Sequence, residues 1–157
     1  MIFDKKKLIK SIAIPLVVGA AAGFLTMRSM KEFEALNQPP LSPPGWLFPV
    51  VWAILYILMG VSSYLILESG AEEVKIQRAI GIYIYQLIVN FLWPTFFFNF
   101  GWYFFSLLWL LLLWVLVLIM IRRFYDISKV AGILQIPYLV WLTFAAYLNL
   151  GVWWLNF

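Results

Sequence analysis

The amino-acid sequence predicts an all-α fold: a polytopic membrane protein forming a bundle of five transmembrane helices, in a single domain over residues 1–157. Of its 157 residues, 65% are hydrophobic and 11% are charged, whereas soluble proteins average roughly 45–50% and about 25%. The charged residues also gather in short groups between long apolar runs. So little polar surface excludes an ordinary soluble enzyme, and so many aromatic residues exclude a disordered chain.

The lengths of the apolar runs predict the number of spans. A helix needs about 20 apolar residues to cross roughly 30 Å of hydrocarbon. The uncharged run 79–121 contains 43 residues, and as one helix it would measure about 65 Å. We therefore expect two helices there, separated by a short glycine-containing turn at 99–102. The five predicted spans are residues 8–28, 45–67, 78–98, 103–123 and 130–154, with a long proline-rich loop over 29–44.

The first span has an alternative interpretation. Lys5, Lys6 and Lys7, the apolar stretch that follows and the run Ala20–Ala22 resemble a secretory signal peptide. No soluble domain follows that such a peptide would export, so we favour a membrane span.

The positive charges predict the orientation of the bundle. Five spans put the termini on opposite sides, and only Arg28 and Lys31 would lie on the side away from the N-terminus. The positive-inside rule then predicts a cytoplasmic N-terminus, with the loop 29–44 and the C-terminus outside. Short termini favour a bacterial plasma membrane, and charge clusters beside apolar runs argue against a nucleic-acid partner. The nine positive residues on the N-terminal side are Lys5, Lys6, Lys7, Lys10, Lys75, Arg78, Arg122, Arg123 and Lys129.

Missing residue types restrict the chemistry. The sequence contains no cysteine and no histidine, so the commonest metal ligands and general base are absent, and we expect neither a metal site nor a resident cofactor. No Asp, Glu, Lys or Arg lies at the centre of a predicted span. Proton relays and ion pumps place charges there, so ion-coupled transport is disfavoured.

Neutral polar and aromatic residues line one face of the third span. Gln86, Asn90, Trp93 and Phe97 follow at spacings of four, three and four, which brings them together on a helix. Pro94 should kink this span and free a backbone carbonyl. Such a face either bonds to neighbouring helices, which is common in membranes, or lines a ligand cavity.

The fifth span repeats this design. We expect Pro137 to kink it, and Tyr138, Trp141, Ala145 and Asn149 share one face. The small Ala145 between larger side chains leaves space for a neighbouring helix or for a ligand.

The first two spans add two further features. Trp52 and Tyr56 share a face of the second span, and Trp52 lies deeper than an interfacial tryptophan belt requires. Gly19 and Gly23 form a G-x-x-x-G pattern in the first span, which permits close helix contact either within the bundle or between two protomers.

Three stretches together resemble the TspO family, also called the translocator protein, peripheral benzodiazepine receptor or tryptophan-rich sensory protein family. The first stretch reads PPGWLFPVVW over 43–52, followed by Leu55, Tyr56 and Gly60. The second contains Gln86, Asn90, Trp93 and Pro94 followed by Phe97 and Phe98, and the third reads PYLVWLTFA over 137–145 followed by Leu148 and Asn149. Their order and spacing cover nearly the whole chain.

The resemblance implies a five-helix bundle, often dimeric, that binds tetrapyrroles such as protoporphyrin IX among its helices, under a capping loop between the first two spans. Eukaryotic members also bind cholesterol and drugs of the isoquinoline carboxamide and benzodiazepine types. The pocket positions of the family correspond here to Trp52, Asn90, Trp93, Tyr138, Trp141, Phe144, Ala145 and Leu148.

The chain departs from the family pattern in its loop and at its C-terminal end. Glu32-Phe33 and Leu41 replace aromatic residues of the family's capping loop. The cholesterol motif requires a basic residue after the fifth span, but the sequence there reads Asn156-Phe157. We therefore do not expect cholesterol as the main ligand.

Three functions remain open at this stage. The first is a membrane receptor, transport or sensing protein for porphyrins and other large flat hydrophobic ligands, which aromatic rings and neutral amides suit. Arg28 and Lys31 are then expected at the rim, near the acidic propionates. The second is light- and oxygen-dependent porphyrin degradation, which the resemblance assigns to Trp52 and Trp141. The third is a structural membrane protein without a ligand.

Overall fold

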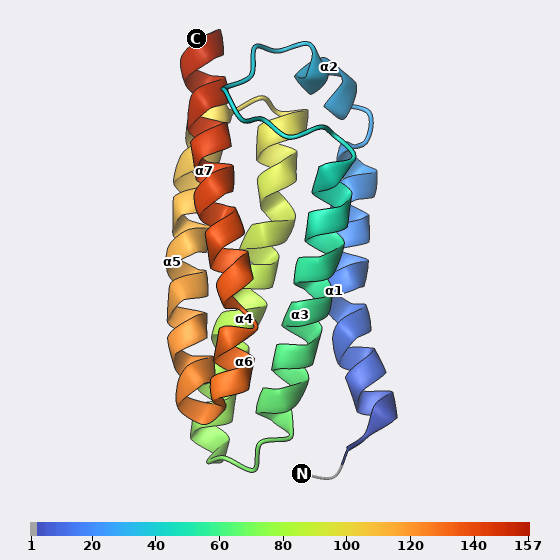
Figure 1. Cartoon of the computed structure of the whole chain (residues 1–157), viewed down its shortest axis with the longest axis vertical. Coiled ribbons are helices and arrows are strands. Elements are labelled where there is room, and N and C mark those ends of the chain that lie inside the picture. The colour runs from blue at the N-terminus through green and yellow to red at the C-terminus, as the bar shows by residue number, and fades with distance from the viewer. Residues whose placement is uncertain (1–2) are drawn as a thin grey trace.

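The fold is all-helical, as predicted. The computed structural model describes residues 3–157 and has five helices long and apolar enough to cross a membrane (Figure 1). Two of these helices are interrupted near one end, and a short helix lies in the loop after the first. The elements are α1 (Lys5–Thr26), α2 (Met30–Glu34), α3 (Leu47–Leu67), α4 (Glu73–Pro94), the π-helical turn η1 (Thr95–Asn99), α5 (Tyr103–Ile127), α6 (Lys129–Ile133) and α7 (Ile136–Asn156).

The long helices form a bundle, and the start of α1 and the end of α7 lie at opposite ends of the molecule (Figure 1). The closest pairs are α1 with α3, α4 with α5, and α5 with α7. By contrast, α3 and α7 share few close backbone contacts within the described residues. The helices around this weak pair carry most of the residues that the sequence singled out.

The fifth span is not one kinked helix. The short helix α6 ends in a turn at Leu134 and Gln135, and α7 begins at Ile136. Pro137 lies in the first turn of α7, so the predicted disturbance of this span takes the form of a break just before the proline rather than a kink within a continuous helix. A proline in a first turn costs no hydrogen bond, because the N–H that it lacks would have no intrahelical partner there.

Pro94 does interrupt the third span, but a π-helical turn follows it instead of a simple kink. It is the last residue of α4, and the chain continues as the π-helical turn η1. Prolines and π-helical turns are both common causes of a change in helix direction. The π-helical turn points Phe97 into the protein, where its side chain is only 3% exposed.

The loop predicted over 29–44 contains a helix that the sequence analysis did not foresee. In α2, the ring of Phe33 packs edge-on against Phe97 and Phe98, with centroid distances of 5.4 and 5.2 Å. The loop then crosses the end of the bundle toward α7 before α3 begins (Figure 1).

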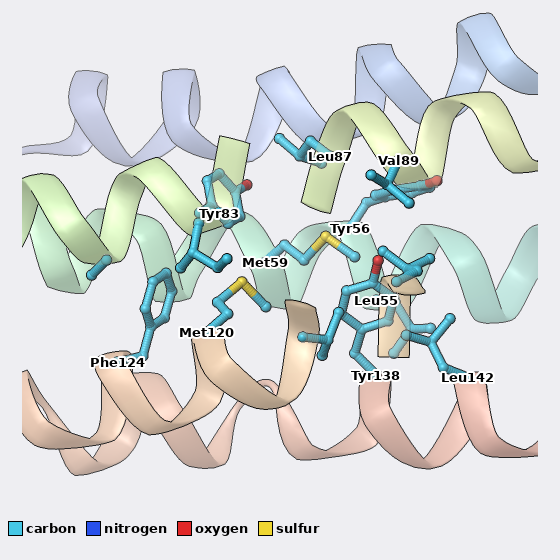
Figure 2. Packing of buried hydrophobic residues seen from close by; sticks show 14 of the residues in the cluster. Leu55, Tyr56, Met59, Tyr83, Leu87, Val89, Met120, Phe124, Tyr138 and Leu142 are labelled. Atoms are coloured by element: carbon cyan, nitrogen blue, oxygen red, sulfur yellow. The ribbon is translucent and has the colours of Figure 1, made fainter. Parts of the chain in front are cut away.

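The hydrophobic core runs along the centre of the bundle (Figure 2). Met59 from α3, Met120 and Phe124 from α5 and Leu142 from α7 are completely buried. Large apolar side chains on the outer faces, such as Phe24, are largely exposed in the isolated chain. Such faces suit the hydrocarbon of a bilayer, where apolar exposure carries no cost.

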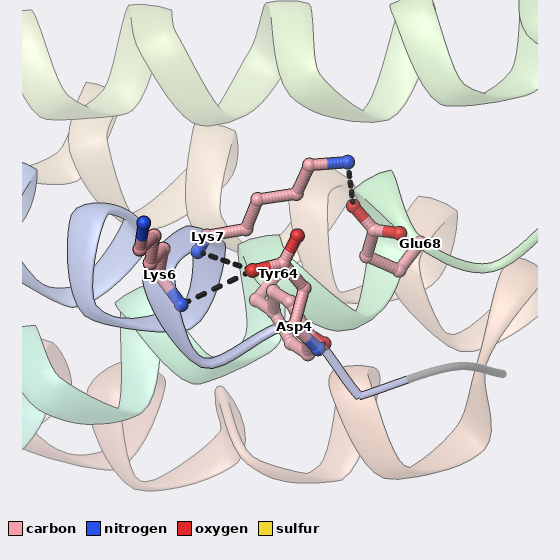
Figure 3. A network of polar contacts seen from close by, with 5 residues as sticks. All are labelled: Asp4, Lys6, Lys7, Tyr64 and Glu68. Carbon is pink, nitrogen blue, oxygen red and sulfur yellow. Dashed lines mark hydrogen bonds and ion pairs between the residues drawn. The ribbon is translucent and has the colours of Figure 1, made fainter.

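Polar contacts fasten the start of α1 to the end of α3 (Figure 3). The Asp4 carboxylate caps α1 by accepting from the backbone N–H groups of Lys6 and Lys7 at 3.1 and 3.2 Å. The Asp4 N–H donates to the Tyr64 hydroxyl at 2.8 Å, and Lys7 Nζ lies 3.2 Å from Glu68 Oε1. These contacts fix the register between the two helices.

Glycines allow α1 and α3 to approach closely. A Cβ on Gly60 would collide with the backbone of Ser11 and Ile12, and a Cβ on Gly19 would collide with the Tyr56 ring. Gly23 has open space around it. The two glycines of the G-x-x-x-G pattern therefore have different surroundings: Gly19 packs against α3 within the bundle, whereas Gly23 faces outward.

Candidate functional site

A chain of hydrogen bonds joins α3, α4 and α7 in the interior. The Tyr56 hydroxyl donates to Asn90 Oδ1 at 2.8 Å, and Asn90 Nδ2 donates to the Tyr138 hydroxyl at 2.6 Å. The Tyr138 hydroxyl donates in turn to Gln86 Oε1 at 2.7 Å. Gln86 Nε2 ends the chain 3.9 Å from Met59 Sδ. We call these five residues the polar chain.

Two of the predicted ligand-binding residues, Asn90 and Tyr138, belong to the polar chain. Asn90 is 4% exposed and Tyr138 is 1% exposed, and their polar groups bond to each other. In this conformation they hold the three helices together and support the walls of the site from behind. Because buried polar groups are costly when unpaired, these bonds fix both side chains firmly.

Aromatic rings cover the polar chain on the side between α3 and α7. The Trp52 ring stacks on Tyr56 at a centroid distance of 5.6 Å and meets Tyr138 and Trp141 edge-on at 6.1 and 6.5 Å. The Trp141 ring also contacts Phe48 at 5.9 Å and Phe144 at 5.6 Å. Edge-on ring pairs of this kind are favourable. We call these six residues the aromatic cluster: Phe48, Trp52, Tyr56, Tyr138, Trp141 and Phe144.

A groove of about 680 Å³ lies outside the aromatic cluster, between α3 and α7. Of the predicted ligand-binding residues, Trp141 and Phe144 line it directly. Trp52 and Tyr138 lie behind Trp141, in ring contact with it or with each other. The remaining lining residues are Val51, Ile54 and Leu55 from α3 and Ile136, Pro137 and Val140 from α7.

Trp141 differs from other tryptophans of the bundle in its N–H group. The indole N–H groups of Trp93, Trp109 and Trp114 donate to oxygen acceptors at 3.2, 2.8 and 2.9 Å. Within residues 3–157, the N–H of Trp141 is buried and has no partner. An unpaired buried donor costs about 1–3 kcal/mol of stability. A ligand that supplied an acceptor to the Trp141 N–H would remove this cost.

Trp93 lies apart from the groove, beneath the loop end of the bundle. Its ring stacks on Phe97 at 4.9 Å, and its N–H donates to Asn149 Oδ1 at 3.2 Å. Asn149 Nδ2 donates to the carbonyl of Tyr103 at 2.8 Å. Ala145 and Leu148 are half-buried on the same stretch of α7. The eight predicted binding residues thus divide between the groove, the polar chain and this region below the loop.

The two predicted rim residues lie at the loop end. Arg28 follows α1 and Lys31 lies in α2, and both side chains are exposed. Neither makes a hydrogen bond or ion pair with another residue in the described range 3–157. Their charges are therefore available to an acidic group that approaches this end of the bundle.

Most of the groove could not be predicted from the sequence. Val51, Ile54 and Leu55 repeat at helical spacing, as do Val140 and Phe144, but such apolar repeats are common along all five spans. Only the weak contact between α3 and α7 distinguishes these residues. The described residues contain no group of three or more His, Cys, Asp or Glu side chains that could hold a metal ion.

Comparison with known proteins identifies the family. The model of the TspO/MBR family matches residues 11–155. The "Tryptophan-rich protein TspO" of Chlorobaculum tepidum is 34% identical over 146 residues, covering 92% of each chain. The protein of the same name from Archaeoglobus fulgidus is 35% identical over 96% of this chain and 97% of its own. The "Translocator protein" of Ovis aries is 37% identical over 87% of this chain and 85% of its own. The chain therefore belongs to the TspO/MBR family of membrane proteins.

Proposed function

We propose that this protein is an integral membrane receptor, transport or sensing protein that binds porphyrins and other large flat aromatic ligands between α3 and α7. The observation that carries the proposal is Trp141, which lines an apolar groove while its buried N–H lacks an acceptor within the described residues. Relatives named translocator protein and tryptophan-rich sensory protein support a role in carrying or sensing a small molecule.

The size and lining of the groove suit such a ligand. Its volume of about 680 Å³ falls within the range of about 300–1,000 Å³ that is typical of small-molecule sites. The Trp141 and Phe144 rings offer faces for stacking, and stacked aromatic pairs gain about 0.5–1.5 kcal/mol beyond their buried area. A tetrapyrrole also carries acceptor atoms for an N–H donor.

The test is a titration of the purified protein with protoporphyrin IX in the dark, followed by the fluorescence anisotropy of the porphyrin. We expect saturable binding that weakens about tenfold in Trp141→Ala, equivalent to a loss of about 1.4 kcal/mol. Trp154→Ala is the matched control, because Trp154 is 72% exposed near the end of α7. Linear, variant-independent uptake would mean that the porphyrin merely partitions into detergent.

The rim residues belong to the same proposal. Porphyrin propionates are acidic, and Arg28 and Lys31 are exposed cations at the loop end. The double substitution Arg28→Ala and Lys31→Ala should weaken protoporphyrin IX more than a porphyrin ester without free carboxylates. Equal effects on both porphyrins would remove these residues from the site.

Light-dependent porphyrin degradation is the second candidate function. The edge-on contact of Trp52 with Trp141 at 6.5 Å favours it, because Trp141 lines the proposed ligand position and a second redox-active ring lies directly behind it. Several turnovers per protein in light and oxygen, lost in Trp52→Phe and Trp141→Phe but kept in Trp153→Phe, would establish it. Bleaching that stops at one porphyrin per protein would leave binding as the function.

We also propose a location and an assembly state. Nine of the eleven Lys and Arg residues fall on the N-terminal side of five spans, which supports a cytoplasmic N-terminus. The open space around Gly23 on the outer face of α1 supports a homodimer contact there. Crosslinking of Gly23→Cys between protomers, with Gly81→Cys as the comparison, tests the dimer.

A further inference from the structure

The boundary between α3 and α7 has little close backbone contact within the described residues, although α3 packs against the short helix α6 that precedes α7. Elsewhere helices meet closely, as α1 does with α3, α4 with α5 and α5 with α7. The contact of α1 with α3 leaves no room at Gly60, where a single added carbon would strike the backbone of Ser11 and Ile12. Because the backbones of α3 and α7 seldom come close within residues 3–157, separating these two helices would displace mainly side chains.

The groove at this boundary leads from the outer surface toward the interior. Ile54 and Val140 form its outer walls, with 53% and 64% of their surface exposed. Leu55, which is 4% exposed, and Trp141 form its inner end. Every lining side chain is aliphatic or aromatic, and α3 and α7 are both candidate membrane spans. The mouth of the groove therefore faces hydrocarbon rather than water.

The loop end of the bundle is fastened much more firmly. Asn37 and Asn156 form two reciprocal hydrogen bonds, at 3.1 Å from the Asn37 N–H and at 2.8 Å to the Asn37 carbonyl. The Tyr147 hydroxyl donates to the Pro40 carbonyl at 2.6 Å, and Phe33 packs on η1. Entry from water at this end requires the loop to move away from α7, whereas no hydrogen bond within residues 3–157 joins α3 directly to α7; Tyr56 and Tyr138 are linked only through Asn90 of α4.

We infer that the ligand enters sideways from the bilayer, through the groove between α3 and α7, with the Trp141 ring as its gate. This inference rests on the proposed function: the occupant is the same flat hydrophobic ligand, which enters between the outer walls and comes to rest against the displaced Trp141 ring at the inner end of the groove. Rotation of Trp141 away from Phe48 and Trp52 opens the inner end of the groove. The same rotation presents the unpaired indole N–H to an acceptor on the ligand.

The absence of cysteine from the sequence makes a crosslinking test clean. One variant carries Ile54→Cys and Val140→Cys, joined across the groove by a bis-maleimide in detergent. The second carries Asn37→Cys and Asn156→Cys, joined across the loop contact. Each protein is then placed in phosphatidylcholine vesicles that already contain protoporphyrin IX, and the rate of association is measured in the dark. Uncrosslinked protein and protein capped with N-ethylmaleimide are the controls.

We expect the groove crosslink to slow association at least tenfold and the loop crosslink to change it less than twofold. Crosslinking the groove after loading should slow dissociation to a similar extent, which separates a blocked route from a filled site. Slowing by the loop crosslink alone, or by neither crosslink, would overturn the inference while leaving the binding site intact. If the uncrosslinked variants show no saturable binding, both the proposed function and the route fail.

Discussion

At the scale of single residues, Tyr138 connects the most groups in the interior. Its hydroxyl accepts from Asn90 and donates to Gln86, at 2.6 and 2.7 Å, while its ring meets Trp52. One side chain of α7 therefore ties α4 to the aromatic cluster on α3. The hydroxyl serves the fold and also the position of the rings around the groove.

Removing that hydroxyl should destabilise the protein. Tyr138→Phe keeps the ring but leaves Asn90 Nδ2 and Gln86 Oε1 without their partner in the interior. We expect a loss of about 1–2 kcal/mol in the free energy of unfolding, measured by thermal or SDS-induced unfolding in detergent. Tyr85→Phe is the control, because Tyr85 is 65% exposed and should change stability little. If Tyr138→Phe and Tyr85→Phe were equally stable, the hydrogen bonds of the Tyr138 hydroxyl would contribute nothing to the free energy of unfolding.

Gln135 presents the opposite case of a buried amide. It lies in the turn between α6 and α7, is completely buried, and neither amide atom has a partner within residues 3–157. Gln135→Leu removes the unpaired groups, so stability should stay equal or rise by up to about 1 kcal/mol. Gln86→Leu, which breaks a bond of the polar chain, should lower stability in the same assay. A comparable loss in both variants would reveal an ordered water at Gln135.

One half of the polar chain could be predicted from the sequence. The spacing of Gln86 and Asn90 predicted their shared face, and the polar chain confirms it. The partners Tyr56 and Tyr138 come from other helices, and their pairing depends on which helices are neighbours. Helical spacing describes a face of one span and carries no information about the order of spans around the bundle.

At the scale of elements, the contact of α1 with α3 depends on Gly60. A Cβ there would meet the backbone of Ser11 and Ile12, which cannot move aside as a flexible side chain would. The hydrogen bond from the Asp4 N–H to the Tyr64 hydroxyl and the ion pair of Lys7 with Glu68 join the same two helices near the start of α1 and the end of α3 (Figure 3). Their relative position therefore tolerates little adjustment.

Gly60→Ala should consequently lower stability by about 1–3 kcal/mol, the usual cost of overpacking. The matched variant is Gly81→Ala in α4, where an added Cβ meets nothing within 4 Å. Alanine is the better helix former by up to about 1 kcal/mol, so this variant should be neutral or more stable. The measurement is thermal unfolding of both variants in the same detergent. Neutral behaviour of Gly60→Ala would contradict the close approach of α1 to α3.

Two elements escaped prediction for physical reasons. The helix α2 is five residues long and rests on Phe33 packing against η1, so tertiary contact rather than local sequence stabilises it. The separation of α6 from α7 follows from the turn at Leu134 and Gln135, which carries neither glycine nor a charge. Pro137 indicated a disturbance of this span, but the sequence did not show that the disturbance would be a complete break at these two residues.

At the scale of the whole molecule, the distribution of charge follows the bundle's long axis. The odd number of spans separates the termini (Figure 1). One end carries the loop with Arg28 and Lys31, and the opposite end carries the other nine Lys and Arg residues. The fold class was predictable because composition and run length depend on the membrane alone. The groove was not predictable, because it depends on how closely α3 and α7, which are far apart in the sequence, pack against each other.

We expect the orientation in the membrane to follow this asymmetry, and it can be measured with single cysteines in the cysteine-free chain. Gln38→Cys lies in the loop before α3, and Glu72→Cys lies in the connection from α3 to α4, at the other end of the bundle; both positions are exposed. Because positive residues stay in the cytoplasm, a membrane-impermeant maleimide added to intact spheroplasts should label Gln38→Cys. It should label Glu72→Cys only after permeabilisation. The reverse pattern would place the loop, and the propionate-binding cations proposed for it, inside the cell. Labelling of both positions in intact spheroplasts would mean that the chain inserts in two orientations, and the charge asymmetry would then be too weak to fix its topology.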